Sequence, residues 1–88
     1  WNVCQYSVLL YMLAQVCGMK AGEFVHVIAD AHIYDRHIPL IEELIRREPL
    51  PAPVFWLNPE VKDFYSFTRD DVKLIDYNTH ERNIPVAI

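Results

Sequence analysis

Residues 30–35 hold the side chains whose types and spacing are best suited to chemistry. In a β-strand, alternate residues lie on one face, so Asp30, His32 and Tyr34 would share a face. The polar tips of His32 and Tyr34 would then approach a common point near the end of that strand. Because strand-to-helix junctions often border ligand sites, ligand binding by both side chains is one hypothesis, although a His and a Tyr at a strand end are more often packing groups. The competing interpretation is that they are packing groups whose polar tips are already satisfied.

The histidines and cysteines predict neither a metal site nor a thiol nucleophile. The pair His32 and His37 straddles a strand end and a helix start, which is poor geometry for one metal ion. Cys4 and Cys17 lie on one apolar helical stretch, where the helix rise would hold them about 20 Å apart, too far for a disulfide. A buried helix also disfavours the thiolate, so we interpret both cysteines as core residues of a protein from the reducing cytoplasm.

The residues around the 30–35 segment predict the elements that must position it. Residues 3–17 predict a helix, with Asn2 as its N-cap and Gly18 as the residue after its end. Apolar residues go nearly all round this helix, so we expect it to be buried on most sides. The rest of the chain is too small to surround it, which indicates that these 88 residues are a fragment.

The remainder of the chain predicts an α+β fold. Residues 24–34 are rich in β-branched and aromatic side chains and are predicted to form a strand. A second helix is predicted over 37–47, with Asp35 as its cap and a proline in its permitted first turn. Short strands are predicted at 54–57 and near 72–77. Two helices against short strands define the α+β class.

Composition excludes several functions. The chain has 88 residues, enough for one small domain, and 52% of them are hydrophobic, so part of the apolar surface should be covered by something else. A net charge of −4, with no cluster of basic residues, argues against nucleic acid as the main partner. The apolar run at 3–17 is shorter than the ~20 residues that a membrane span needs.

Several stretches together resemble thymidylate synthase, and the resemblance extends over all 88 residues. Their order and spacing carry the likeness, and they are Trp1–Tyr6, Ala14–Gly18, Asp30–Asp35 followed by His37, Arg47–Pro49, Trp56–Lys62 and Pro85–Ile88. The resemblance implies that residues 1–88 are the C-terminal part, about a third, of a single thymidylate synthase domain. The implied architecture is part of an α/β sandwich, with two helices packed on short strands of a mixed sheet.

The resemblance also implies a reaction, the reductive methylation of dUMP to dTMP. The co-substrate 5,10-methylenetetrahydrofolate would supply both the carbon and the hydride, and the whole enzyme would be a cytoplasmic homodimer. In this family a cysteine thiolate adds to the pyrimidine ring. That cysteine and the phosphate-binding arginines lie upstream of the motif that contains Asn2. We therefore expect no catalytic residue in this chain and no activity from the chain alone.

Binding residues are implied position by position. Asn2 corresponds to the asparagine whose amide reads the edge of uracil, and His32 and Tyr34 to the pair that bonds the deoxyribose hydroxyl. The closing tail over the folate would be formed by Val86, Ala87 and Ile88.

The sequence departs from the usual family pattern at a few positions. They are Trp1 for Phe, Ala21 for Pro, Ala29 for Gly, and a stretch after Tyr77 that is one residue shorter. These departures affect detailed geometry rather than the resemblance.

Two alternatives stay open at this point. A deoxynucleotide hydroxymethylase of the same fold would prefer Asp at position 2 when its base is cytosine, so Asn2 favours uracil. A non-catalytic, truncated binding or dimerisation module is the alternative from another functional class.

Overall fold

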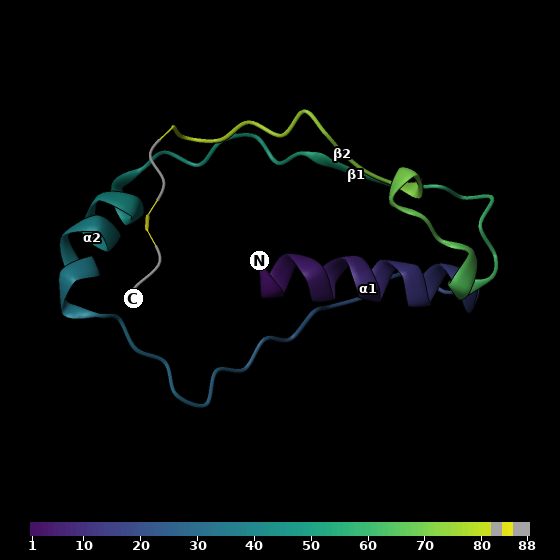
Figure 1. The fold of residues 1–88 in the computed structure, drawn as a ribbon, viewed down its shortest axis with the longest axis horizontal. Helices are drawn as coiled ribbons and strands as arrows, with labels where there is room; N and C mark the ends of the chain where they lie inside the picture. The colour runs from purple at the N-terminus through teal and green to yellow at the C-terminus, as the bar shows by residue number, and fades with distance from the viewer. Residues whose placement is uncertain (82–83, 86–88) are drawn as a thin grey trace.

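The computed structural model describes residues 1–81 and 84–85 of the chain. The regular elements are helices α1 (Asn2–Val16) and α2 (Ile38–Arg46) and strands β1 (Val54–Leu57) and β2 (Val72–Ile75). Short 3-10 turns cover Asp35–His37, Phe64–Ser66 and Arg69–Asp71. The β1–β2 pair runs above α1, and α2 lies at the opposite end of the molecule from the C-terminal end of α1 (Figure 1). The predicted α+β class is confirmed.

Helix α1 matches the predicted helix to within one residue at each end. Its start differs, because Trp1 is the N-cap and Asn2 is already the first helical residue. The Gln5 N–H donates to the Trp1 carbonyl at 2.9 Å, so the first hydrogen bond of the helix begins one residue earlier than expected. The prediction that Asn2 caps the helix is therefore wrong.

The end of α1 follows from Gly18. This residue has φ +68°, a left-handed conformation that a glycine adopts without steric cost. Its N–H donates to the Gln15 carbonyl at 3.1 Å, and the next N–H, of Met19, donates to the Ala14 carbonyl at 2.8 Å. Two carbonyls of the last turn are thereby satisfied, as the prediction for Gly18 requires.

The two strands form an antiparallel pair in which Val54 faces Ile75 and Leu57 faces Val72. The prediction for 54–57 is confirmed. The second strand was predicted to reach residue 77 but ends at Ile75, because Asp76 has φ +57° and turns the backbone out of the ladder. Between residues 1 and 81 the sheet is antiparallel throughout, so the mixed sheet expected from the resemblance is not found in the described part of the chain.

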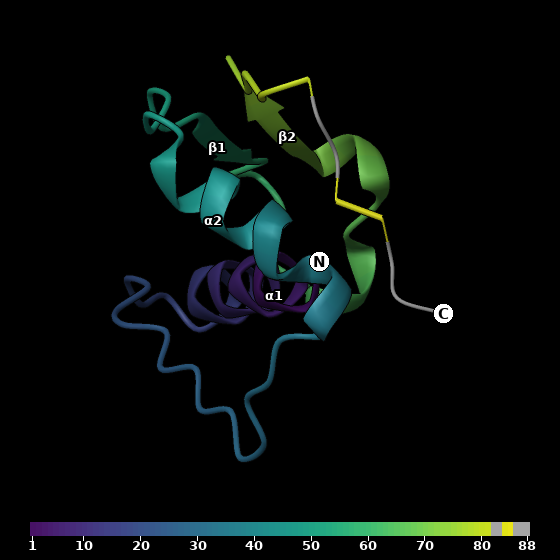
Figure 2. The ribbon, with the colours of Figure 1, turned by 90° about the vertical axis from the view of Figure 1, so that its left-hand side faces the viewer.

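Residues 24–34 do not form the predicted strand. In both views this segment projects away from the β1–β2 pair as an extended loop between α1 and α2 (Figures 1 and 2). A strand needs the N–H and C=O groups of a neighbouring strand, and the only ladder among the described residues joins β1 to β2. The β-rich composition is therefore present without the partner that it requires.

Helix α2 begins one residue later than predicted and follows a 3-10 turn. The His37 N–H donates to the Tyr34 carbonyl at 2.8 Å and closes that turn. His37 is then the N-cap of α2, and Asp35 opens the 3-10 turn, so the prediction of Asp35 as the cap is wrong. A proline lies in the first turn of α2, as expected.

None of the described residues is buried. Helix α1 packs one side against β1, where the Tyr11 and Phe55 ring centroids are 5.0 Å apart. Apart from its contact with the loop after β1, most of its surface stays open, as expected if these 88 residues are too few to surround the helix. Both cysteines are free and exposed, and their interpretation as core residues is wrong for the same reason.

A prediction follows from the open apolar surface. The 88-residue chain in solution should self-associate or bind a hydrophobic dye strongly, because side chains such as Val27 (81% exposed) and Ile45 (76% exposed) contact water. Dye fluorescence and light scattering, measured over a range of protein concentrations, test this. A monodisperse monomer that binds no dye would contradict it.

Candidate nucleotide site

Two of the predicted binding residues, His32 and Tyr34, lie against each other. Their ring centroids are 5.3 Å apart and the ring planes meet at 88°, an edge-to-face contact. No strand holds them, yet their i, i+2 spacing in an extended segment places them side by side, as predicted. The side chain of His32 is 57% exposed and Tyr34 is 54% exposed. Both polar tips are therefore accessible to a ligand.

A backbone carbonyl determines the tautomer of His32. Nδ1 of His32 lies 3.1 Å from the Asp30 carbonyl oxygen. Because a carbonyl oxygen only accepts, Nδ1 must carry the proton in this contact, and in the neutral ring Nε2 is then an acceptor. The Asp30 carboxylate, 3.9 Å from the same nitrogen, favours a proton there as well. His32 thus offers an acceptor, and Tyr34 a hydroxyl, on neighbouring rings.

Asn2 comes from a different element. It is exposed in the first turn of α1, whereas His32 and Tyr34 lie on the loop that passes below that helix (Figure 1). The structure thus brings His32 and Tyr34 together, whereas Asn2 belongs to another element. The predicted tail residues, Val86, Ala87 and Ile88, lie outside the described residues.

A hydrogen-bonded tether at the C-terminal end of α1 was missed by the sequence analysis. Gln15 Nε2 donates to the carbonyls of Asn58, at 2.8 Å, and Val61, at 2.9 Å. Both amide protons are used, so the side chain joins α1 to the loop after β1. The available signal was a glutamine within an apolar helix, which indicates a polar partner but does not identify it.

The same loop is tied to the start of β2. Asn58 Nδ2 donates to Asp71 Oδ1 at 2.9 Å, and the Asn58 N–H donates to the Asp71 carbonyl at 2.8 Å. The other carboxylate oxygen accepts from the Thr68 N–H at 2.7 Å and from its hydroxyl at 3.1 Å. The Asn58 amide first, and then the Thr68 N–H, lower the pKa of the Asp71 carboxyl, since each stabilises the charged form. These hydrogen bonds have a structural role, because they join the loop after β1 to the turn that precedes β2.

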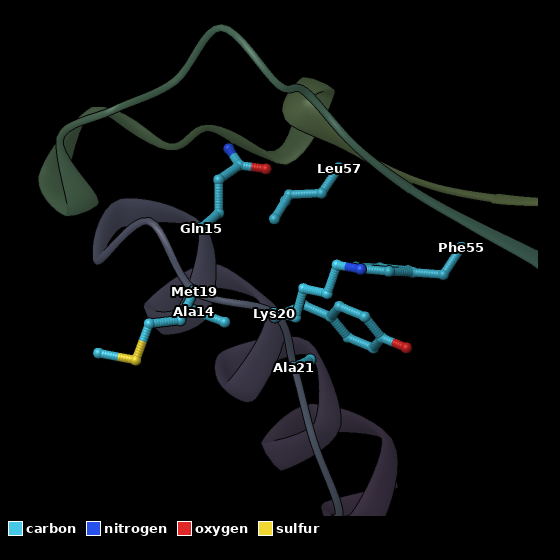
Figure 3. Close-up of a pocket in the computed structure, with 8 residues that line it drawn as sticks. Ala14, Gln15, Met19, Lys20, Ala21, Phe55 and Leu57 are labelled. Carbon is cyan, nitrogen blue, oxygen red and sulfur yellow. The ribbon is translucent and has the colours of Figure 1, made fainter.

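A recess of about 520 Å³ lies between α1 and β1 and is distinct from the predicted site (Figure 3). Its lining includes Tyr11, Gln15, Lys20 and Phe55. A more apolar hollow of about 410 Å³ adjoins it between α1 and β2 and includes Cys4. Neither hollow is lined by Asn2, His32 or Tyr34. The candidate site therefore consists of Asn2 and of the two contacting rings of His32 and Tyr34, called the ring pair below.

Residues 1–81 and 84–85 hold no cluster of three or more His, Cys, Asp or Glu side chains that could bind a metal ion. No helix in the same part of the chain is long and apolar enough to cross a membrane.

Comparisons with known proteins place this α+β unit in one family. The thymidylate synthase family profile matches residues 1–88. A thymidylate synthase from Bacillus mojavensis is 51% identical over 82 residues, which are 93% of this chain and 29% of that protein. A bifunctional dihydrofolate reductase-thymidylate synthase from Zea mays is 46% identical over 82 residues, 16% of its length. The chain belongs to the thymidylate synthase family.

The fold agrees with this assignment. The thermostable thymidylate synthase A from Bacillus subtilis superposes with a TM-score of 0.91 at 48% sequence identity. The match covers 98% of this chain and 31% of the Bacillus chain. The chain therefore spans less than a third of the length of each of these relatives.

Proposed function

We propose that this chain supplies part of the nucleotide and folate sites of a thymidylate synthase, which converts dUMP to dTMP. The co-substrate would be 5,10-methylenetetrahydrofolate, the source of both the carbon and the hydride. The observation that carries the proposal is the family match over the whole chain, at about 50% identity to synthases. Cys4 and Cys17 take no catalytic part in it, and the nucleophile is assigned to a segment outside these residues.

The ring pair would bind the sugar of dUMP. A deoxyribose hydroxyl both donates and accepts a hydrogen bond. Nε2 of His32 can accept its proton, while the Tyr34 hydroxyl can donate to its oxygen. The proposal draws on the contact of the two rings, whose centroids lie 5.3 Å apart. This complementarity supports the pairing proposed from the resemblance.

The other proposed roles concern the base, the co-substrate and assembly. Asn2 would read uracil, which favours a synthase over a hydroxymethylase that acts on cytosine. Val86, Ala87 and Ile88 would close over the folate and exclude water from the reacting atoms. The whole enzyme would be a homodimer in the cytoplasm, with no membrane or nucleic acid partner. The many exposed apolar side chains of this chain are consistent with cover from other protein surfaces.

A hybrid enzyme tests the proposal. In it, residues 1–88 replace the matching segment of the Bacillus subtilis thymidylate synthase A, a protein whose fold they match. We expect the hybrid enzyme to form dTMP from dUMP and the folate, and the 88-residue chain alone to form none, because an absent nucleophile cannot be replaced by orientation. A folded hybrid enzyme that binds dUMP but never forms dTMP, or activity from the isolated chain, would contradict the proposal.

Removing either sugar contact should weaken nucleotide binding. Tyr34→Phe and His32→Ala in the hybrid enzyme should each raise the KM for dUMP by about 5- to 150-fold, since an unsatisfied hydrogen-bonding partner costs about 1–3 kcal/mol. His26→Ala is the matched control, because His26 is an exposed histidine on the same loop that stacks on Phe24 instead. A 3′-deoxy analogue should lose less affinity in the two variants than in the parent. An equal loss in all three would place the sugar contact elsewhere.

A further inference from the structure

The ring of Tyr34 contacts a second histidine besides His32. The centroid of the His37 ring lies 6.0 Å from that of Tyr34, and the planes meet at 88°, so this contact is also edge-to-face. Tyr34 therefore lies against two imidazoles. His37 is half-buried, whereas His32 and Tyr34 are exposed.

His37 has the firmer backbone of the two histidines. Its N–H donates to the Tyr34 carbonyl at 2.8 Å, which closes the 3-10 turn Asp35–His37. It is also the N-cap of α2, with φ −94° and ψ −9°. His32 lies instead in the extended segment that has no strand partner among the described residues. Of the two histidines whose rings touch Tyr34, His37 is thus the one whose backbone is held by regular structure.

We propose that His37 is a positioning residue for nucleotide binding, acting through Tyr34. Its ring limits the rotamers of Tyr34 and so keeps the phenol hydroxyl where the sugar hydroxyl would bind. This inference rests on the proposed sugar contact of Tyr34. The hydrogen bond from the His37 N–H holds the backbones of residues 34 and 37 together. The ring contact then limits the orientation of their two side chains.

The test compares variants that keep or lose the ring in the hybrid enzyme. His37→Leu replaces the ring with an apolar side chain of moderate size, and His37→Phe keeps an aromatic edge. We expect the KM for dUMP to rise about 2- to 12-fold in His37→Leu, the size of an aromatic pair contribution, and to stay within about 2-fold of the parent in His37→Phe. The kcat at saturating dUMP should change little in both, as expected when only binding shared by ground state and transition state is lost.

A double variant separates positioning from general support of the fold. In the Tyr34→Phe background there is no hydroxyl to place, so His37→Leu should add less than about 2-fold to the KM. His37→Gln serves as a second variant without a ring, and thermal melting is recorded for each protein.

Four outcomes with the position-37 variants would overturn the inference. They are equal effects of Leu and Phe at position 37, an undiminished effect in the Tyr34→Phe background, no rise in KM in His37→Leu, or failure of both ring-less variants to fold. If Tyr34→Phe leaves the KM for dUMP unchanged in an active hybrid enzyme, the sugar contact itself is wrong and the inference falls with it. If Tyr34→Phe raises the KM as expected but His37→Leu does not, the inference about His37 is wrong and the proposed sugar contact of Tyr34 stands.

Discussion

Asn2→Asp in the hybrid enzyme is expected to lower kcat/KM for dUMP and to raise the relative activity on dCMP. Uracil presents an N3–H donor beside the O4 acceptor, and a carboxamide answers both, with its oxygen accepting and its NH₂ donating. Cytosine presents an amine donor beside an N3 acceptor, which a protonated carboxyl group can match. Two hydrogen bonds change, each worth about 1–3 kcal/mol, so the ratio of the two kcat/KM values should shift by roughly 10²-fold or more.

The substitution at position 2 should not disturb the start of α1. Because Trp1 is the N-cap, the Asn2 side chain is not needed to begin the helix. The folded state should therefore tolerate Asp. Asn2→Ala is the control that loses both polar groups, and it should reduce activity on both nucleotides. If Asn2→Asp kept the parental ratio, the proposed reading of the base would be wrong.

Removal of Val86, Ala87 and Ile88 from the hybrid enzyme is expected to lower kcat by roughly 10²-fold, the cost of lost alignment at the reacting atoms. The proposed contacts of these residues form when both ligands are bound, so the dissociation constant of dUMP alone should change by less than about 3-fold. Single-turnover kinetics and dUMP titration measure the two quantities separately. Ile88→Val, which keeps the tail length, should retain most of the activity. An unchanged kcat after the deletion would remove these residues from the proposed folate site.

Elements encoded by local sequence were predicted well. The helix Asn2–Val16 could be predicted because its apolar residues lie within the segment and Gly18 marks its end. The strand Val54–Leu57 could be predicted because prolines bound it on both sides. Residues 24–34 have strand composition too, but strand formation depends on a partner, which sequence composition does not supply. The N-caps of the two helices were predicted one or two residues away from their positions. The cap of α1 is Trp1 and not Asn2, and a 3-10 turn precedes α2; both depend on backbone geometry.

The candidate site shows the same division. The adjacency of His32 and Tyr34 could be predicted, since it follows from spacing along an extended backbone. The contact of Tyr34 with His37 could not be predicted, because it depends on the 3-10 turn that places the His37 ring against Tyr34. The bonds from Gln15 reach 43 and 46 residues along the chain, and no short-range pattern identifies such partners. The family resemblance, which depends on many stretches at once, was confirmed by the comparisons.

The amide of Gln15 also makes this fold sensitive to chemical ageing. Both of its protons are donated to backbone carbonyls, those of Asn58 and Val61. Deamidation would replace the donor NH₂ with a carboxylate oxygen, and a charged acceptor would then face two carbonyl oxygens that can only accept. A change of one mass unit at a single side chain would convert the attachment of α1 to the loop after β1 into a repulsion.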